Sequence, residues 1–155
     1  MRVIGCGNPE AGDDAVGLLA VDRARSELER MPGVEVVRTG AGLHVADLLA
    51  GVDAAVVVDA VRAPAGGRAP GTLVRAEAGP EGLPAEVGSS LSSHGFGVAE
   101  AIGLVAALDG APRVVFLGLE VEQVTAGSPP SDAVAEALPR LVEAVVAEAR
   151  TLAGT

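Results

Sequence analysis

Two adjacent carboxylates, Asp13 and Asp14, follow a glycine-rich turn directly after a short apolar N-terminal segment. A strand that passes through such a turn into a helix commonly binds phosphate, because backbone N–H groups and the positive end of the helix dipole attract anions. Two carboxylates at this position repel a phosphate and attract a cation. Capping of the following helix is the alternative role for one of them, since a helix needs a single N-cap residue. The turn therefore predicts oxygen ligands for a cation at one edge of a sheet.

Two further residues extend this set. Asp59 closes the apolar run of residues 54–59, where a carboxylate is costly if it is buried without a partner. Hydrogen bonds from loop amides, a metal ion or a proton would each relieve that cost. His94 stands just before a predicted helix, where a solvated histidine is the alternative. Asp14, Asp59 and His94 together form a two-carboxylate, one-imidazole set that suits Zn, Ni, Mn or Fe, with positions left for water or substrate.

The other reactive side chains fit different roles. Cys6 is expected to be a small buried residue, because a catalytic thiol needs a basic environment and this end of the strand is acidic. His44 is expected at the surface near the start of a helix. The early glycines do not fit the dinucleotide spacing G-x-G-x-x-G, and no phosphate-loop lysine follows them. No G-x-S-x-G sequence occurs, so the serines before His94 do not form a nucleophile elbow.

Composition narrows the classes of partner. The chain has 155 residues, a net charge of −10, no Trp and no Tyr, which argues against nucleic acid and against an anionic membrane surface. A single cysteine excludes an internal disulfide and fits a reducing compartment. No secretory signal is visible, and no apolar run approaches the roughly 20 residues of a membrane span. These features predict a cytoplasmic globular protein with one domain, residues 1–155.

Apolar runs of strand length alternate with helical patterns along the chain. Strands are predicted at residues 2–6, 34–38, 54–59, 71–76 and 113–119. Helices are predicted at residues 14–30, 43–49, 95–108 and from Ser131 onward, where Pro139 is expected to kink or split the helix. Loops are predicted at residues 62–70, 79–93 and 120–130. This alternation predicts an α/β fold, a single three-layer domain in which a mostly parallel or mixed twisted sheet of about five strands carries helices on both faces. In such folds ligands bind beyond the carboxyl ends of the strands, where Asp14 and Asp59 are both expected.

Taken in order, four segments resemble the nickel–iron hydrogenase maturation endopeptidases over nearly the whole chain. The first is Gly5-x-Gly7-Asn8-x-x-x-x-Asp13-Asp14-x-x-Gly17, and the second is Asp59-Ala60-Val61 followed by Pro70-Gly71-Thr72. The third is Ser93-His94-x-x-Gly97. The fourth is Phe116-Leu117-Gly118-Leu119-Glu120, which comes before a proline-containing last helix. The chain departs from the family pattern at Asp14, where glutamate is common. It departs again at Arg38-Thr39-Gly40, where an aspartate is common.

The resemblance implies an endopeptidase that removes a short C-terminal extension from the nickel-loaded large-subunit precursor of a nickel–iron hydrogenase. The family's metal-contacting residues correspond to Asp14, Asp59 and His94. The residues that would support them are Gly7, Asn8 and Asp13. The nickel is expected to be presented by the precursor, with zinc as a surrogate, and it would polarise the scissile carbonyl or activate water. Two alternatives stay open: a metal-dependent hydrolase of another amide, and a non-catalytic nickel-dependent maturation chaperone.

Overall fold

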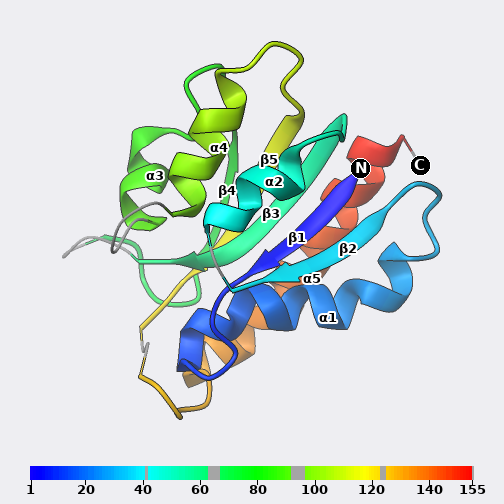
Figure 1. The fold of residues 1–155 in the computed structure, drawn as a ribbon. Coiled ribbons are helices and arrows are strands. Elements are labelled where there is room, and N and C mark those ends of the chain that lie inside the picture. Colours follow the sequence, from blue (N-terminus) through cyan, green and yellow to red (C-terminus); the bar gives the residue numbers. More distant parts are fainter. Residues whose placement is uncertain (41, 63–66, 92–96, 123–124, 155) are drawn as a thin grey trace.

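Strands and helices alternate along the chain in a computed structural model that describes residues 1–40, 42–62, 67–91, 97–122 and 125–154 (Figure 1). The strands are β1 (Arg2–Cys6), β2 (Glu35–Thr39), β3 (Ala54–Val61), β4 (Leu73–Glu77) and β5 (Arg113–Glu120). The helices are the 3-10 turn η1 (Gly12–Ala15), α1 (Val16–Leu28), α2 (Leu43–Leu49), α3 (Ala85–Leu91), α4 (Val98–Ala106) and α5 (Asp132–Ala153).

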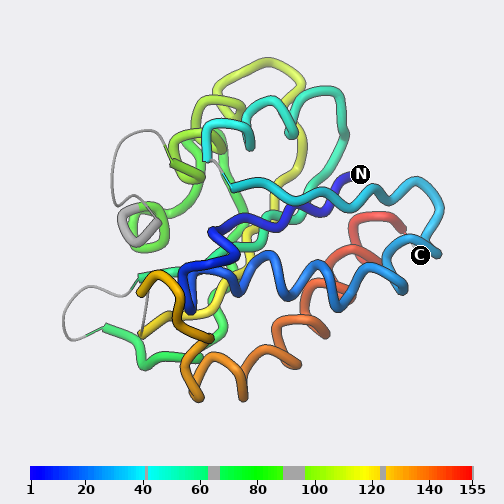
Figure 2. The backbone as a smooth tube through the Cα atoms, turned by 60° about the horizontal axis from the view of Figure 1, so that its bottom comes forward, coloured from blue at the N-terminus to red at the C-terminus, as the bar shows by residue number. Residues whose placement is uncertain are grey.

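The strands form one mixed sheet in the order β2-β1-β3-β5-β4, in which β4 runs antiparallel to β5 and the other pairs are parallel. Helices α1 and α5 pack on one face, and α2, α3 and α4 lie on the other (Figures 1 and 2). The predicted three-layer α/β fold with a mixed five-stranded sheet is therefore confirmed. Because β1 and β3 are parallel neighbours, their carboxyl ends meet at the same edge of the sheet.

Strand β3 shows why the sheet is buried on both faces. Its side chains alternate between the two layers: Val56 and Val58 pack with α1 and α5, whereas Ala55 and Val57 pack with α2 and α4. A strand covered by helices on both faces reads as a continuous apolar run, and burial of each such valine stabilises the fold by about 1.5–3 kcal/mol. The strand continues to Val61, past the predicted end at Asp59, and pairs with β5 over its full length.

The predicted loop at residues 79–93 is wrong, because it contains α3 (Ala85–Leu91). Its first turn is closed by backbone hydrogen bonds from Val87 and Gly88 to the carbonyl of Pro84. Val87 is buried in the layer formed with α4, so tertiary packing stabilises a helix whose sequence has little apolar periodicity.

Helix α5 runs from Asp132 to Ala153 with Pro139 inside it, so of the predicted kink or split at Pro139 the split does not occur. Pro139 has no N–H to bond the carbonyl of Ala135, but both residues are exposed and water can satisfy that carbonyl. The opposite face, with Leu138 and Leu141, is buried against the sheet. None of the helices in the described ranges, α5 included, is long and apolar enough to cross a bilayer.

Candidate active site

A small pocket at the carboxyl ends of β1 and β3 brings Asp14 and Asp59 together. It has a volume of about 130 Å³. Its lining residues are Cys6, Gly7, Asp14, Gly40, Gly42, Asp59, Gly97 and Val98. Half of them are glycines, so much of the wall is backbone, and the two carboxylates are the charged groups of the lining.

The glycine turn after β1 positions Asp14. The backbone N–H of Asn8 donates to Asp14 Oδ2 over 3.1 Å, and Asn8 Oδ1 accepts from the N–H of Glu10 over 3.0 Å. Gly7 has a φ of +143°, and a Cβ there would lie 2.0 Å from the carbonyl oxygen of Asp14, so only glycine fits. The turn thus fixes one oxygen of Asp14 and leaves Oδ1 without a hydrogen bond to the described residues.

Asp59 enters the same pocket from β3. Its Oδ1 accepts a hydrogen bond from the N–H of Ala60 over 2.8 Å, and its Oδ2 makes none with the described residues. Burial raises the pKa of Asp59 from its ordinary 3.8 to about 7; the hydrogen bond from Ala60 opposes that rise and the charge of Asp14 adds to it. Asp59 therefore shares its pocket with a second carboxylate, and its protonated form is favoured up to about pH 7.

Cys6 is buried between the two acids. Burial, and then the charges of Asp59 and Asp14, raise the pKa of the Cys6 thiol well above its ordinary value. The thiol stays protonated at neutral pH, and a protonated thiol is a poor nucleophile and metal ligand. This agrees with the prediction of a small buried residue.

Asp13 has a different role from its neighbour. Its side chain is fully buried. It accepts hydrogen bonds from the N–H of Glu122 (2.9 Å), the N–H of Ser131 (2.5 Å) and the hydroxyl of Ser131 (2.9 Å). Neither η1 nor α1 has a side-chain cap, so the expectation that one of the two aspartates caps its own helix is wrong. Asp13 instead joins η1 to the start of α5, and so supports the turn that carries Asp14.

The structure describes one of the two histidines, His44, and not the other. His94 lies outside the described residues, although Gly97, three positions later, lines the pocket. His44 is exposed in the first turn of α2, as predicted. Within the described ranges, no group of three or more His, Cys, Asp or Glu side chains is arranged to hold a metal ion. The described part of the site is thus a pair of carboxylates.

Two features of the region were not anticipated from the sequence. One is the glycine wall, for which the only signal was the short spacing of Gly40 and Gly42 after a strand. The other is Glu120, the last residue of β5, which is fully buried although it is charged. Arg68 Nε donates to Glu120 Oε1 over 2.5 Å, while Oε2 is buried and has no hydrogen-bond partner among the residues that the structure describes. The sequence feature that could have indicated this buried residue is a glutamate at the end of the long apolar run of β5.

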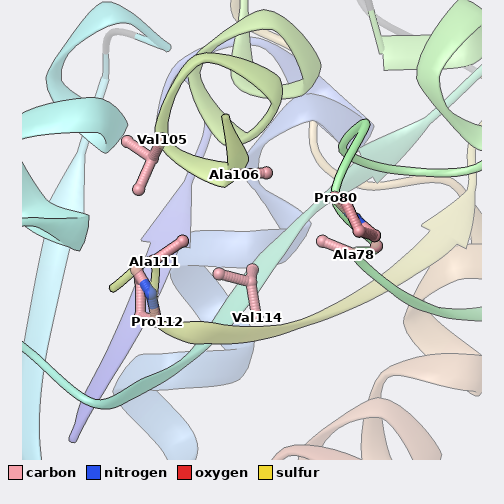
Figure 3. A pocket seen from close by; sticks show the side chains of 8 residues that line it. Ala78, Pro80, Val105, Ala106, Ala111, Pro112 and Val114 are labelled. Carbon is pink, nitrogen blue, oxygen red and sulfur yellow. The ribbon is translucent and has the colours of Figure 1, made fainter. Parts of the chain in front are cut away.

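A second pocket, of about 260 Å³, lies between the end of α4 and the start of β5 (Figure 3). Val105 and Ala106 come from α4, Pro112 and Val114 from the start of β5, and Pro80 from the segment after β4 (Figure 3). No ionisable side chain lines this pocket, which stands at the opposite end of β5 from the carboxyl edge. The carboxylate pocket is therefore the better candidate for chemistry.

Comparisons with known proteins agree with this fold. The hydrogenase maturation protease family matches residues 20–148. The hydrogenase maturating endopeptidase HybD from E. coli superposes with a TM-score of 0.73 and 24% identity, over 97% of this chain and 91% of that one. The [NiFe] hydrogenase maturation protease HybD from Thermococcus kodakarensis gives a TM-score of 0.68 and 22% identity, over 96% and 97% of the two chains. The solution structure of an endopeptidase from Escherichia coli superposes with a TM-score of 0.74 and 22% identity, over 97% of this chain and 93% of that one. No curated protein matches the sequence.

Proposed function

This chain belongs to the hydrogenase maturation protease family, and we propose that it cleaves the C-terminal extension from the large-subunit precursor of a nickel–iron hydrogenase at the pocket of Asp14 and Asp59. His94, which lies outside the described residues, is the third metal-contacting residue of this proposal. The observation that supports it is the meeting of two carboxylates in one glycine-lined pocket at the carboxyl edge of the sheet, each with one oxygen that bonds none of the described residues.

The donor set fits a divalent cation. Asp14 Oδ1 and Asp59 Oδ2 make no hydrogen bond to the described residues, and two such oxygens with an imidazole suit nickel or zinc. The nickel is presented by the precursor as part of the substrate, and zinc can take its place. A metal bound here would polarise the scissile carbonyl or lower the pKa of a water.

The side chains of the pocket would act on the substrate and its protons. Asp14 is held by Asn8, so its free oxygen keeps one direction when the substrate enters. Asp59 has a pKa of about 7, and it would release its proton as a cation arrives. The protonated thiol of Cys6 leaves water as the nucleophile in this proposal.

The test is cleavage of the purified nickel-loaded precursor, followed by mass spectrometry. We expect the wild type to shorten the precursor, and Asp14→Ala, Asp59→Ala and His94→Ala each to reduce the rate by at least about a hundredfold. His44→Ala is the matched control, because His44 is exposed outside the pocket and its loss should leave the rate unchanged.

The outcome that would overturn the proposal is full activity of Asp59→Ala or His94→Ala. A stable complex in which the precursor keeps its mass would indicate a non-catalytic maturation chaperone. Turnover of small amide substrates without any precursor would indicate a metal-dependent hydrolase of another kind.

A further inference from the structure

Gly40 stands where an unpaired strand edge reaches the carboxylate pocket. It follows β2 directly and is exposed, and it lines the pocket together with Asp14 and Asp59. A Cβ built on Gly40 would have a single neighbour within 4 Å among the described residues, the carbonyl oxygen of Gly7 at 3.7 Å. The described residues therefore leave space in front of Gly40.

The outer edge of β2 is not paired with another strand, although the carbonyl of Val36 on that side accepts a hydrogen bond from Arg25 over 3.5 Å. β2 is the end strand of the sheet and pairs with β1 alone. The bonds Glu35 N–H to Met1 O and Gly7 N–H to Thr39 O show that the odd-numbered residues of β2 face β1. In a parallel ladder the alternate residues then direct their N–H and C=O groups to the other side. Gly40 forms a bend directly after the strand, and its N–H and C=O make no hydrogen bond within the described ranges.

We propose that an extended segment of the precursor, spanning the cleavage point, binds beside the end of β2 with its main chain hydrogen-bonded to Gly40. A free strand edge pairs readily with an extended peptide. Here that edge ends at the two carboxylates, so the added segment delivers a peptide bond to them. This inference rests on the proposed function and names how the same site holds its substrate.

The rest of the pocket supports a main-chain mode of binding. Its volume of about 130 Å³ has room for little more than one residue, and half of its lining residues are glycines. The acids at its base, Asp14 and Asp59, disfavour an anionic side chain at the cleavage point. Gly40 therefore acts as a substrate-positioning residue, through its backbone and through the absence of a side chain.

Gly42, two positions later, has a different task. A Cβ on Gly42 would lie 2.7–2.8 Å from backbone atoms of Gly97 and Val98, so the starts of α2 and α4 touch there. Alanine at Gly42 would disturb the fold, whereas alanine at Gly40 meets no close atom of the described chain. Gly40 is thus the position where a side chain can block the pocket without disturbing its walls.

The experiment compares Gly40→Ala and Gly40→Val with the control Gly79→Ala. A Cβ on Gly79 has no neighbour within 4 Å, and Gly79 lines the far apolar pocket. Unfolding midpoint in urea, affinity for the nickel-loaded precursor, KM and kcat are measured for each. We expect unchanged midpoints in all variants. We expect a KM and a Kd raised about tenfold in Gly40→Ala, more in Gly40→Val and not at all in Gly79→Ala, with a smaller change in kcat.

Synthetic peptides across the cleavage point give a second readout. N-methylation of one peptide bond at a time removes one N–H donor, and we expect one position to weaken competition with the precursor for wild type but not for Gly40→Val. Equal affinities of Gly40→Val and Gly79→Ala would overturn the inference. Precursor that binds but is never cleaved would overturn the protease function and leave the Gly40 comparison intact. Precursor that neither binds nor is cleaved by the wild type would overturn both.

Discussion

Asp13 accepts hydrogen bonds from both the N–H and the hydroxyl of Ser131, a residue that stands 118 positions further along the chain. The first turn after β1 is thereby joined to the start of α5. Its neighbour Asp14 accepts a hydrogen bond from the N–H of Asn8, six positions away, and lines the pocket. Two adjacent and chemically identical residues are thus divided between a buried junction of two segments and the lining of the pocket.

This division predicts opposite effects of the two alanine variants. Asp13→Ala removes a fully buried carboxylate that accepts three hydrogen bonds from Ser131 and Glu122, and we expect a loss of about 2–4 kcal/mol in the free energy of unfolding. Asp14→Ala should cost less than about 1 kcal/mol and still abolish cleavage. Urea unfolding of the two variants and wild type checks this, and equal midpoints for the two would contradict the structural role of Asp13.

The raised pKa of Asp59 predicts a pH dependence of stability. The folded protein binds a proton at Asp59 up to about pH 7, whereas the unfolded chain loses it near 3.8. Between these values the folded state holds more protons, so this residue's contribution to stability falls as the pH rises and is constant above about 7. We expect Asp59→Asn to remove that fall, so that its urea midpoint changes less with pH than that of the wild type. Parallel midpoint curves for the two proteins would contradict the raised pKa.

Metal binding can be measured without the precursor. We expect calorimetric titration of metal-free protein with nickel or zinc to show about one equivalent, and His94→Ala and Asp59→Asn to lose it. His44→Ala should bind like the wild type. Below pH 7, binding should also release a proton, which titrations in buffers of different ionisation enthalpy would detect. Binding that is unchanged in Asp59→Asn would place the metal elsewhere.

The central strands were predictable because their pattern is local. The apolar run of β3 and the carboxylate that interrupts it at Asp59 are consecutive in the sequence. A continuous apolar run of this length is typical of a strand that is buried on both faces. Helix α3 was not predictable in the same way. Val87 is the buried position among the side chains of α3 that the structure describes, and the helix depends on packing against α4.

The candidate site was predictable only in part, for a related reason. Asp14 and Asp59 each follow or end a strand, and topology alone brings such residues to one edge. The role of Asp13 depends on Ser131, which no local pattern connects to it. Gly40 carries no side chain, so its place in the pocket follows from the end of β2 and from the packing of α2 against α4.

The pair of exposed Arg68 and buried Glu120 predicts that one substitution is more harmful than two. Arg68 Nε is the side-chain donor that contacts Glu120 among the described residues, so Arg68→Ala leaves a buried carboxyl group without that partner and should cost about 1–3 kcal/mol. The double variant Arg68→Leu/Glu120→Leu removes both charges and should recover most of that loss, because an apolar pair of similar volume needs no partner. Arg113→Ala is the control: its ion pair with Glu77 is exposed on both sides, and its loss should change the unfolding midpoint little. Urea unfolding of the four proteins separates these cases. A double variant as unstable as Arg68→Ala would mean that the shape of the pair, and not its unpaired charge, governs the stability of this edge of the sheet.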